Sequence, residues 1–300
     1  MSQRCSTGTP VGTDAFSDAT LIVFGHGSTV NEQSSAPVFQ HCAELRRRGV
    51  FKEVREAFWK QEPNLQQIIE CATTPRVFLA PLFISDGYFS EQVIPEALGF
   101  RQKDQQNDFN RALPRSNQTL FYCRAVGSHP AMAKVVFDRA EEVLTKFPFP
   151  TPPKPGDTTL FIAGHGTEQN SNSRAAIDLQ VEQLRAAGTY ADVQAVFMDQ
   201  APHIRESYRL CRTRNMIVVP LFISDGMHVQ EDIPVLLGEP KRIVEQRLAA
   251  ATATWRNPSE KQGKLVWYTP SVGTDPLVAD VILERVREAR SGYMSALAPE

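Results

Sequence analysis

The sequence lacks the features typical of membrane, secreted and nucleic-acid-binding proteins. Its longest dense apolar stretch, residues 216–223, contains Pro220 and is far shorter than the roughly 20 residues of a membrane-spanning helix. Residues 1–18 are rich in Ser, Thr and Gly and have no apolar segment like that of a secretory signal. Lys and Arg number 32 against 34 Asp and Glu, so no basic excess points to nucleic acid or an anionic membrane. We therefore expect a cytoplasmic protein that binds neither.

Cysteine is also scarce, and its pattern excludes two kinds of site. The five cysteines are odd in number, spread along the chain and without a C-x-x-C pair; they are Cys5, Cys42, Cys71, Cys123 and Cys211. This pattern argues against a disulfide framework and a thiolate zinc site, and it fits reduced thiols in the cytoplasm. Cys42 falls at an apolar helical position, which predicts a small buried side chain.

Phosphate-binding and serine-hydrolase motifs are missing as well. The chain has no G-x-G-x-x-G segment and no Walker lysine, so it has no phosphate-binding loop. It also has no G-x-S-x-G elbow to support a catalytic triad of Ser224, Asp225 and His228. A metal-assisted hydrolase would need an open zinc site, and we rank it last among the alternatives.

What the chain does contain is a second copy of itself, at an offset of 139 residues. The segment Pro-Leu-Phe-Ile-Ser-Asp-Gly at 81–87 returns unchanged at 220–226, and Gly-His-Gly at 25–27 returns at 164–166. The 300 residues are 42% hydrophobic and 22% charged, which is ordinary for a globular chain of about two modest domains. We infer that two copies of one domain are fused.

Each copy reads as alternating strands and helices. Short apolar runs predict parallel strands, at 20–25, 53–59, 76–84 and 119–125 in the first copy and at 159–164, 192–198, 215–223 and 264–269 in the second. An amphipathic helix follows the first strand of each copy and ends at Gly49 or Gly188. The predicted fold class is α/β, with two repeated open parallel-sheet lobes of flavodoxin-like type related by a pseudo-twofold axis.

The repeat also predicts where the domains begin and end. The predicted units are a flexible N-terminus (1–18), a first lobe (19–146), a proline-rich linker (147–157) and a second lobe (158–300) that carries the complete site. Segments 101–118 and 239–263 differ between the copies and are predicted as excursions near one mouth of each sheet. Because the two lobes are fused in one chain, we expect a monomer.

Histidines at the predicted strand ends are the candidate functional groups. Ligands of open α/β sheets bind beyond the carboxyl ends of the strands. The glycines of Gly-His-Gly have a structural explanation in the sharp exit from the strand, but the histidine between them does not. One such histidine alone could equally be a structural residue. In the second copy, however, His228 follows another strand end, so that His165 and His228 are expected to face each other, and Glu231 shares the helical face of His228.

The second copy resembles a known family. Gly-His-Gly-Ser/Thr after the first strand, followed by Pro-Leu-Phe-x-x-x-Gly-x-His-x-x-Glu-Asp-Ile-Pro, is similar to the sirohydrochlorin chelatases of the CbiX type, which are class II tetrapyrrole chelatases. The resemblance covers residues 20–146 and 158–290, as in a two-repeat long form. It implies chelatase-like lobes and ATP-independent insertion of Co²⁺ or Fe²⁺ into sirohydrochlorin. The family's motif histidines correspond to His165 and His228, and its motif glutamate corresponds to Glu231.

The first copy departs from this pattern. It keeps His26, but Phe89 stands where the second copy has His228, and Gln92 stands where it has Glu231. We therefore expect one working site, and an aromatic wall for the macrocycle formed by Tyr88 and Phe89; core packing is the alternative for this pair. Met227 is expected to add to the wall that contacts the tetrapyrrole. Whether the first lobe retains activity through His26 stays open.

The expected chemistry follows from metal insertion into a rigid ring. The two histidines would deliver the metal and accept pyrrole protons, and Glu231 would orient a histidine or pass protons to solvent. No tightly bound cofactor is expected, because the divalent metal (Co²⁺ favoured, then Fe²⁺, with Ni²⁺ also possible) is a substrate. The macrocycle carries many carboxylates, so basic residues should rim the cleft; the candidates are Arg174, Arg205, Lys241 and Arg242. The alternative is a non-catalytic tetrapyrrole- or metal-binding protein.

Overall fold

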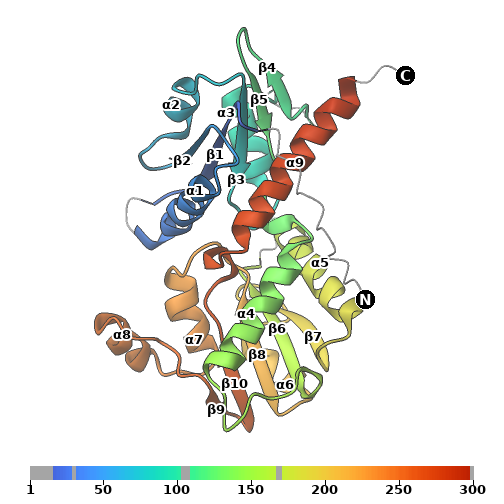
Figure 1. The fold of residues 1–300 in the computed structure, drawn as a ribbon. Coiled ribbons are helices and arrows are strands. Elements are labelled where there is room, and N and C mark those ends of the chain that lie inside the picture. The colour runs from blue at the N-terminus through green and yellow to red at the C-terminus, as the bar shows by residue number, and fades with distance from the viewer. Residues whose placement is uncertain (1–15, 29–31, 103–108, 167–170, 298–300) are drawn as a thin grey trace, which may run out of the picture.

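Two five-stranded sheets form the cores of two lobes, one above the other in Figure 1. The computed structural model describes residues 16–28, 32–102, 109–166 and 171–297. The first sheet, in the first lobe, consists of β1 (Ala19–Gly25), β2 (Glu53–Phe58), β3 (Arg76–Pro81), β4 (Ala112–Pro114) and β5 (Thr119–Tyr122). The second sheet, in the second lobe, consists of β6 (Thr158–Gly164), β7 (Asp192–Phe197), β8 (Asn215–Pro220), β9 (Ser259–Lys261) and β10 (Lys264–Tyr268).

The two sheets have the same topology. Their strand orders are β2-β1-β3-β5-β4 and β7-β6-β8-β10-β9. All pairs are parallel except the last in each sheet, where the short strands β4 and β9 run antiparallel to their neighbours. The predicted α/β class, with two open and mostly parallel sheets, is confirmed. The antiparallel edge strands were not predicted; they lie in the segments 101–118 and 239–263.

The helices connect the strands in the predicted places, except that a helix in the segment 239–263 was not predicted. The α-helices are α1 (Ala36–Arg48), α2 (Leu65–Glu70), α3 (Ile94–Leu98), α4 (Met132–Lys146), α5 (Ser171–Ala187), α6 (Ser207–Leu210), α7 (Ile233–Leu236), α8 (Lys241–Ala249) and α9 (Val278–Leu297). Helix α1 ends where predicted, because Gly49 adopts φ 64° and its N–H donates to the Arg46 carbonyl. In the part of the chain that the structure describes, no helix is long and apolar enough to cross a membrane.

Short single-turn helices mark the strand ends. The 3₁₀-helices are η1 (Glu32–Ser34), η3 (Val126–Ser128), η4 (Pro155–Asp157), η5 (Ile204–Glu206) and η7 (Val272–Thr274). Two turns are π-helical, η2 (Phe89–Val93) and η6 (His228–Asp232), and they occupy equivalent places in the two lobes. Because π-helical turns are uncommon and often lie at functional sites, their repetition draws attention to these two segments.

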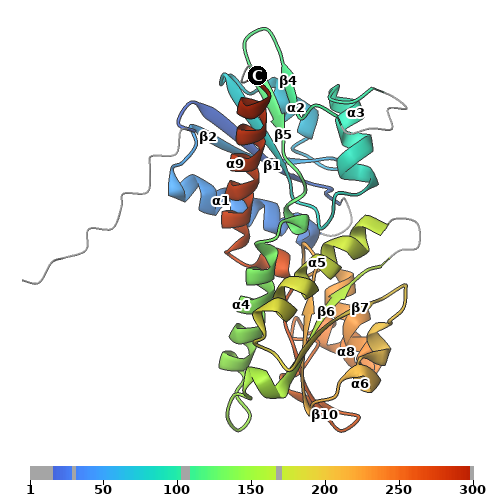
Figure 2. The same cartoon turned by 90° about the vertical axis from the view of Figure 1, so that its right-hand side faces the viewer.

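The last helix of each repeat packs on the sheet of the other repeat. Helix α4 packs against β8 and β10 of the second lobe, and α9 packs against β3 and β5 of the first lobe. Figures 1 and 2 show α9 along the upper lobe and α4 along the lower one. The predicted bounds 19–146 and 158–300 therefore describe sequence repeats, whereas each packed lobe takes its last helix from the other repeat.

Two buried arginines hold this helix exchange together in the same way on both sides. Arg139 of α4 donates to the Ser271 carbonyl (3.2 Å) and the Thr274 hydroxyl (3.0 Å). Arg285 of α9 donates to the Ala125 carbonyl (2.9 Å) and to Ser128 Oγ (2.8 Å). The reciprocity is what a twofold relation between the two halves produces.

The end of the predicted N-terminal segment and the start of the proline-rich linker both pack against a lobe. Residues 1–15 lie outside the part of the chain that the structure describes, but Phe16 is buried and stacks on Phe51 at a centroid distance of 5.3 Å, so the packed part of the first lobe begins before residue 19. The proline-rich segment 147–157 leads from α4 to β6, and its first carbonyl, that of Phe147, accepts a hydrogen bond from Trp267 Nε1 (2.9 Å). The linker is therefore attached to the second lobe.

Candidate functional site

Glycines on both sides of His165 shape the strand exit that presents it. Gly164 ends β6 so close to α5 that an added Cβ would lie 2.0 Å from Ile177 Cδ1. Gly166 adopts φ 73°, which side-chain-bearing residues rarely do. The imidazole between them is half-exposed at the carboxyl edge of the second sheet. The sequence expectation that the flanking glycines are structural is confirmed.

The structure brings the two predicted histidines together. The rings of His165 and His228 lie 5.0 Å apart, nearly perpendicular at 83°. His165 Nδ1 is 2.9 Å from the Gly166 carbonyl oxygen, and His228 Nδ1 is 2.7 Å from Asp232 Oδ2. Both acceptors lack a proton, so each neutral imidazole carries its proton on Nδ1 and keeps the Nε2 lone pair for a metal or a proton.

Two aspartates complete this pair, and neither was predicted from the sequence. Asp232 accepts the hydrogen bond from His228 within the π-helical turn. Asp199 Oδ2 lies 3.2 Å from His165 Nδ1. The sequence signal for Asp232 was the i, i+4 spacing from His228. The signal for Asp199 was its place directly after a predicted strand, 192–198, that neighbours the strand preceding His165.

Glu231 is at the site but does not contact either histidine through a hydrogen bond. It lines a cavity of about 470 Å³ together with His165, His228 and both aspartates. The orienting role that the sequence suggested for Glu231 is filled by Asp232, because it is Asp232 that bonds His228 Nδ1. The Glu231 side chain lines the cavity without a hydrogen bond to either histidine ring.

Two of the four predicted basic residues reach this cavity. Arg205 and Lys241 line it, so the cavity holds two positive charges beside its three carboxylates. Arg174 instead stacks over Phe197 (5.3 Å) and pairs with Asp178 (3.2 Å). Arg242 is not among the residues that line the cavity.

The first lobe repeats the geometry of this pair without its chemistry. His26 and Phe89 have ring centroids 5.1 Å apart at 77°, close to the arrangement of the two histidines. Phe89 offers neither a metal ligand nor a proton acceptor. The residue equivalent to Asp199 is Lys60, whose ammonium lies 5.9 Å from the centre of the Phe89 ring.

A second cavity, of about 760 Å³, joins the two lobes. Its lining includes His26 and Lys60 from the first lobe and His165 and Phe222 from the second. His165 lines both this cavity and the smaller one with His228. The two spaces therefore meet at His165, and a large flat ligand could reach the histidine pair from between the lobes.

Exposed apolar side chains lie next to both strand mouths. Tyr88 and Met227 occupy equivalent positions, and they are 60% and 64% exposed. Phe89 is half-buried and meets Tyr88 edge-on, with ring centroids 6.2 Å apart. Tyr88 is therefore not a core residue, and core packing does not account for it.

A buried tyrosine holds the backbone at each π-helical turn, and in the first lobe the Tyr122 hydroxyl donates to the Ser90 carbonyl (2.7 Å). In the second lobe, the Tyr268 hydroxyl donates to the Val229 carbonyl (2.6 Å), directly after His228. Burial raises the pKa of Tyr268 well above its usual value, so the hydroxyl remains a donor.

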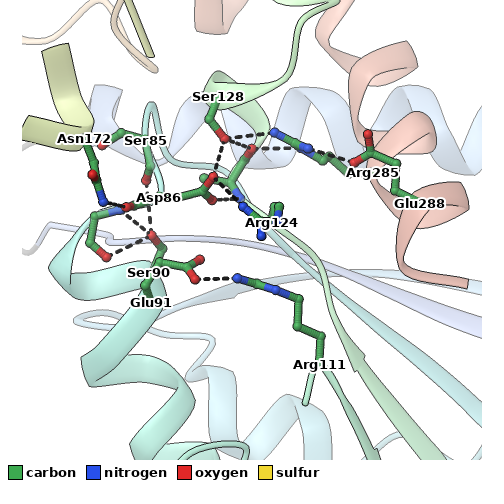
Figure 3. A network of polar contacts seen from close by, with 12 residues as sticks. Ser85, Asp86, Ser90, Glu91, Arg111, Arg124, Ser128, Asn172, Arg285 and Glu288 are labelled. Atoms are coloured by element: carbon green, nitrogen blue, oxygen red, sulfur yellow. Dashed lines mark hydrogen bonds and ion pairs between the residues drawn. The ribbon is translucent and has the colours of Figure 1, made fainter. Parts of the chain in front are cut away.

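A polar network joins the first lobe to the exchanged helix α9. Asp86 accepts from the Ala125 amide and from Ser128 Oγ, both at 2.8 Å. Figure 3 shows this network continuing through Ser128 to Arg285 of the exchanged helix.

The arrangement suits temporary metal binding. In the part of the chain that the structure describes, no group of three or more His, Cys, Asp or Glu side chains is placed to hold a metal ion together. Two imidazole nitrogens can bind a first-row divalent ion, and the open side of the cavity leaves room for a ligand that takes the ion away.

Comparisons with known proteins agree on one family. The CbiX family model matches residues 20–143 and 159–289. The chain is 39% identical over 278 residues to a probable sirohydrochlorin cobaltochelatase of Halobacterium salinarum, covering 90% of this chain and 91% of that protein. A multi-domain Deinococcus radiodurans protein described as structurally similar to chelatases superposes with a TM-score of 0.72 at 26% identity, covering 89% of this chain and 54% of that one. SirB from Bacillus subtilis with Fe³⁺ superposes with a TM-score of 0.64 at 15% identity, covering 92% and 97%.

Proposed function

The chain belongs to the CbiX family, and from this premise we propose that it inserts a divalent metal ion into sirohydrochlorin, without ATP, at the histidine pair of its second lobe. The observation that carries the proposal is the 5.0 Å ring separation of His165 and His228, each with its Nδ1 engaged and its Nε2 available. The name of the Halobacterium relative supports the reaction. Both histidines line one cavity, and His165 also lines the cavity between the lobes, which gives a macrocycle a route to the metal ligands.

The proposed reaction exchanges two protons for one metal ion. The metal loses water ligands to the Nε2 atoms of His165 and His228, which hold it beside the ring. Two pyrrole N–H bonds then break, the nitrogens bind the metal, and two protons leave. Holding both reactants in one cavity supplies the proximity that the uncatalysed reaction lacks. No phosphate chemistry enters this sequence of steps.

The acidic residues have separate proposed tasks. Asp232 holds His228 in the tautomer that directs Nε2 away from the helix, since its carboxylate lies 2.7 Å from Nδ1. Asp199 does the same for His165 together with the Gly166 carbonyl, and its negative charge attracts the incoming cation. Glu231 lines the cavity without bonding either ring, and we assign it the transfer of released protons to solvent.

Cobalt is the metal that we propose first. The Halobacterium relative, 39% identical over nearly the full chain, is named a probable cobaltochelatase. Imidazole ligands bind Co²⁺, Fe²⁺ and Ni²⁺, so the ligand set alone does not choose among them. A preference for Co²⁺ would assign the chain to cobalamin synthesis, and a preference for Fe²⁺ would assign it to siroheme synthesis.

An anaerobic absorbance assay tests the proposal. Sirohydrochlorin is mixed with Co²⁺, Fe²⁺ or Ni²⁺, with and without the purified chain, and the loss of the metal-free spectrum is followed. We expect acceleration with Co²⁺ first and Fe²⁺ second. Binding of sirohydrochlorin without acceleration by any of the three metals would identify a carrier and contradict the proposed enzyme.

Substitution of each histidine tests the single-site assignment. His165→Ala and His228→Ala should each lower kcat/KM by about a hundredfold or more, because each removes a ligand and proton acceptor. His26→Ala should have a smaller effect, since its partner is Phe89. Circular dichroism should confirm that all three variants fold. If His26→Ala lost as much activity as His228→Ala, a single site in the second lobe would be the wrong assignment.

A further inference from the structure

Lys60 stands in the first lobe where Asp199 stands in the second. The Asp199 amide donates to the His165 carbonyl (3.0 Å), and the Lys60 amide donates to the His26 carbonyl (2.8 Å). The same backbone hydrogen bond therefore places each side chain beside the histidine at the strand end of its own lobe. Between the two copies, the charge at this position is reversed.

The Lys60 ammonium is available to a ligand. The side chain is exposed, and within the described residues it has no carboxylate at ion-pairing distance. The ammonium lies over the face of Phe89, 5.9 Å from the ring centre. Lys60 also lines the cavity between the lobes, together with His26 and His165. An unpaired cation thus borders the space that leads to the histidine pair.

The charge reversal means that the two equivalent strand-end regions attract ligands of opposite charge. In the second lobe, Asp199 and Asp232 attract a cation toward the histidines. In the first lobe, Lys60 repels a cation and attracts a carboxylate, while Phe89 offers an apolar ring in place of a metal ligand. A metal ion is therefore drawn to the second-lobe side of His165, whereas Lys60 offers a carboxylate a contact on the first-lobe side.

We propose that Lys60 is a substrate-binding residue that pairs with a peripheral carboxylate of the tetrapyrrole in the cavity between the lobes. This inference rests on the proposed function, since it takes the macrocycle as the ligand. Arg205 and Lys241 line the cavity on the other side of His165, so Lys60 supplies a contact from the opposite lobe. Contacts from two sides fix the rotation of the ring, which decides whether its pyrrole nitrogens face His165 and His228.

Binding of metal-free sirohydrochlorin to the full-length chain tests this role. Kd is measured anaerobically, without metal, by quenching of tryptophan fluorescence. Lys60→Met should raise Kd about fivefold, the change expected for one solvent-accessible charged contact. Lys60→Arg should stay close to the wild type, and Lys60→Asp should bind more weakly than Lys60→Met. Added salt should weaken binding by the wild type more than by Lys60→Met.

Lys52→Met is the matched control. Lys52 is an exposed lysine of the same lobe that directly precedes β2, whereas Lys60 follows β2 at the opposite edge of the sheet. This control should bind sirohydrochlorin as the wild type does. Binding of Co²⁺ alone should be equal in the wild type and Lys60→Met, because Lys60 contacts no metal ligand of the second lobe.

The outcomes separate this inference from the proposed function. If the wild type accelerates metallation and Lys60→Met binds sirohydrochlorin with the wild-type Kd, the role of Lys60 is overturned and the chelatase proposal stands. If the wild type neither binds nor metallates sirohydrochlorin, both proposals fail. An equal loss of affinity in Lys52→Met would also overturn the assignment, because it would reflect the general charge of the lobe.

Discussion

Asp232 decides which nitrogen of His228 faces the cavity. Asp232→Ala removes the acceptor 2.7 Å from His228 Nδ1, so the ring is free to rotate and to change tautomer. We expect metal affinity and kcat/KM to fall about 10- to 100-fold, as for other carboxylates that orient metal-binding histidines. The nitrogen chemical shifts of His228 in NMR should report a mixed tautomer.

Two neighbouring variants show whether orientation is the cause. Asp232→Asn keeps an acceptor for Nδ1–H without the charge, and it should recover part of the activity and most of the tautomer signal. Glu231→Gln should lower kcat without changing the His228 spectrum, since Glu231 makes no hydrogen bond to the ring. A normal His228 tautomer in Asp232→Ala would contradict the orienting role.

His41 predicts a loss of stability in mild acid. It is fully buried at the contact between the lobes, where Nε2 bonds the Gly273 carbonyl (2.7 Å), and burial lowers its pKa below the usual 6.5. Below pH 6.5, His41 binds a proton in the unfolded chain but stays largely neutral in the folded chain. The free energy of unfolding should therefore fall as pH drops from 6.5, by at most about 1.4 kcal/mol per pH unit.

The second lobe provides the control for His41. Gln180 occupies the equivalent place and donates to the His129 carbonyl (3.2 Å). In urea unfolding measured between pH 7.5 and 5, His41→Gln should show a shallower dependence on pH. Burial also lowers the pKa of His129, which leaves a smaller slope of the same sign. An unaltered slope in His41→Gln would rule out His41 as its source.

Among the site residues, the sequence predicted the ones whose side chain is unusual for its position in the fold. His165 and His228 were found because a histidine between glycines has no structural explanation. Asp199 and Asp232 were missed because an aspartate after a strand or beside another acid is common at turns and helix starts. Their role depends on which side chain is nearest to Nδ1, and that distance is set by the π-helical turn and by the neighbouring strand.

At the scale of elements, the exchanged helices α4 and α9 depend on their arginines. Arg285 is 5% exposed and Arg139 is 7% exposed, and both satisfy backbone carbonyls of the opposite repeat. Arg285→Met leaves the Ala125 carbonyl and Ser128 hydroxyl without this donor. We expect the free energy of unfolding to fall by about 2 to 4 kcal/mol, measured in urea.

Symmetry supplies the comparison for this prediction. Arg139→Met should cost a similar amount, because its contacts with Ser271 and Thr274 mirror those of Arg285. The exposed Arg287, which pairs with Glu284 on the same helix, should change stability by less than about 0.5 kcal/mol when replaced by Met. A similar loss in Arg287→Met would show that charge on α9, and not the buried contacts, is responsible.

Element types were predicted well because apolar periodicity reports burial on one or both faces. Strands β1 and β6 are buried along their whole length, as their continuous apolar runs predicted. Strands β4 and β9 have three residues each and lie at the sheet edge, so they carry almost no periodic signal. The π-helical turns were predicted only as helix starts, since one wider turn does not alter the hydrophobic pattern.

At the scale of the whole molecule, neither repeat should fold by itself. A fragment ending at residue 157 lacks α9 on its sheet, and a fragment beginning at 158 lacks α4. We expect each fragment to be insoluble or unfolded when produced alone. Produced together, they should co-purify and regain metallation. Cooperative unfolding of either isolated fragment in circular dichroism would contradict this expectation.

The helix exchange itself was beyond the reach of the sequence. The two sheets have the same strand order, and α4 and α9 both carry buried apolar residues, so the sequence pattern does not distinguish which sheet each helix covers. The sequence repeat places each helix after its own last strand but is silent about which sheet it then covers.

The exchange also has a consequence during synthesis on the ribosome. The first sheet is complete once Tyr122 has emerged, yet its cover, α9, ends at Leu297. At roughly 5 to 20 residues per second, the apolar face that α9 later covers stays uncovered for about 9 to 35 s. During that interval Phe121, which finally packs edge-on against Tyr293 at 5.2 Å, faces water or a chaperone. The nascent chain therefore cannot fold its halves in order of appearance, and the first lobe reaches its final packing only after the second has been made.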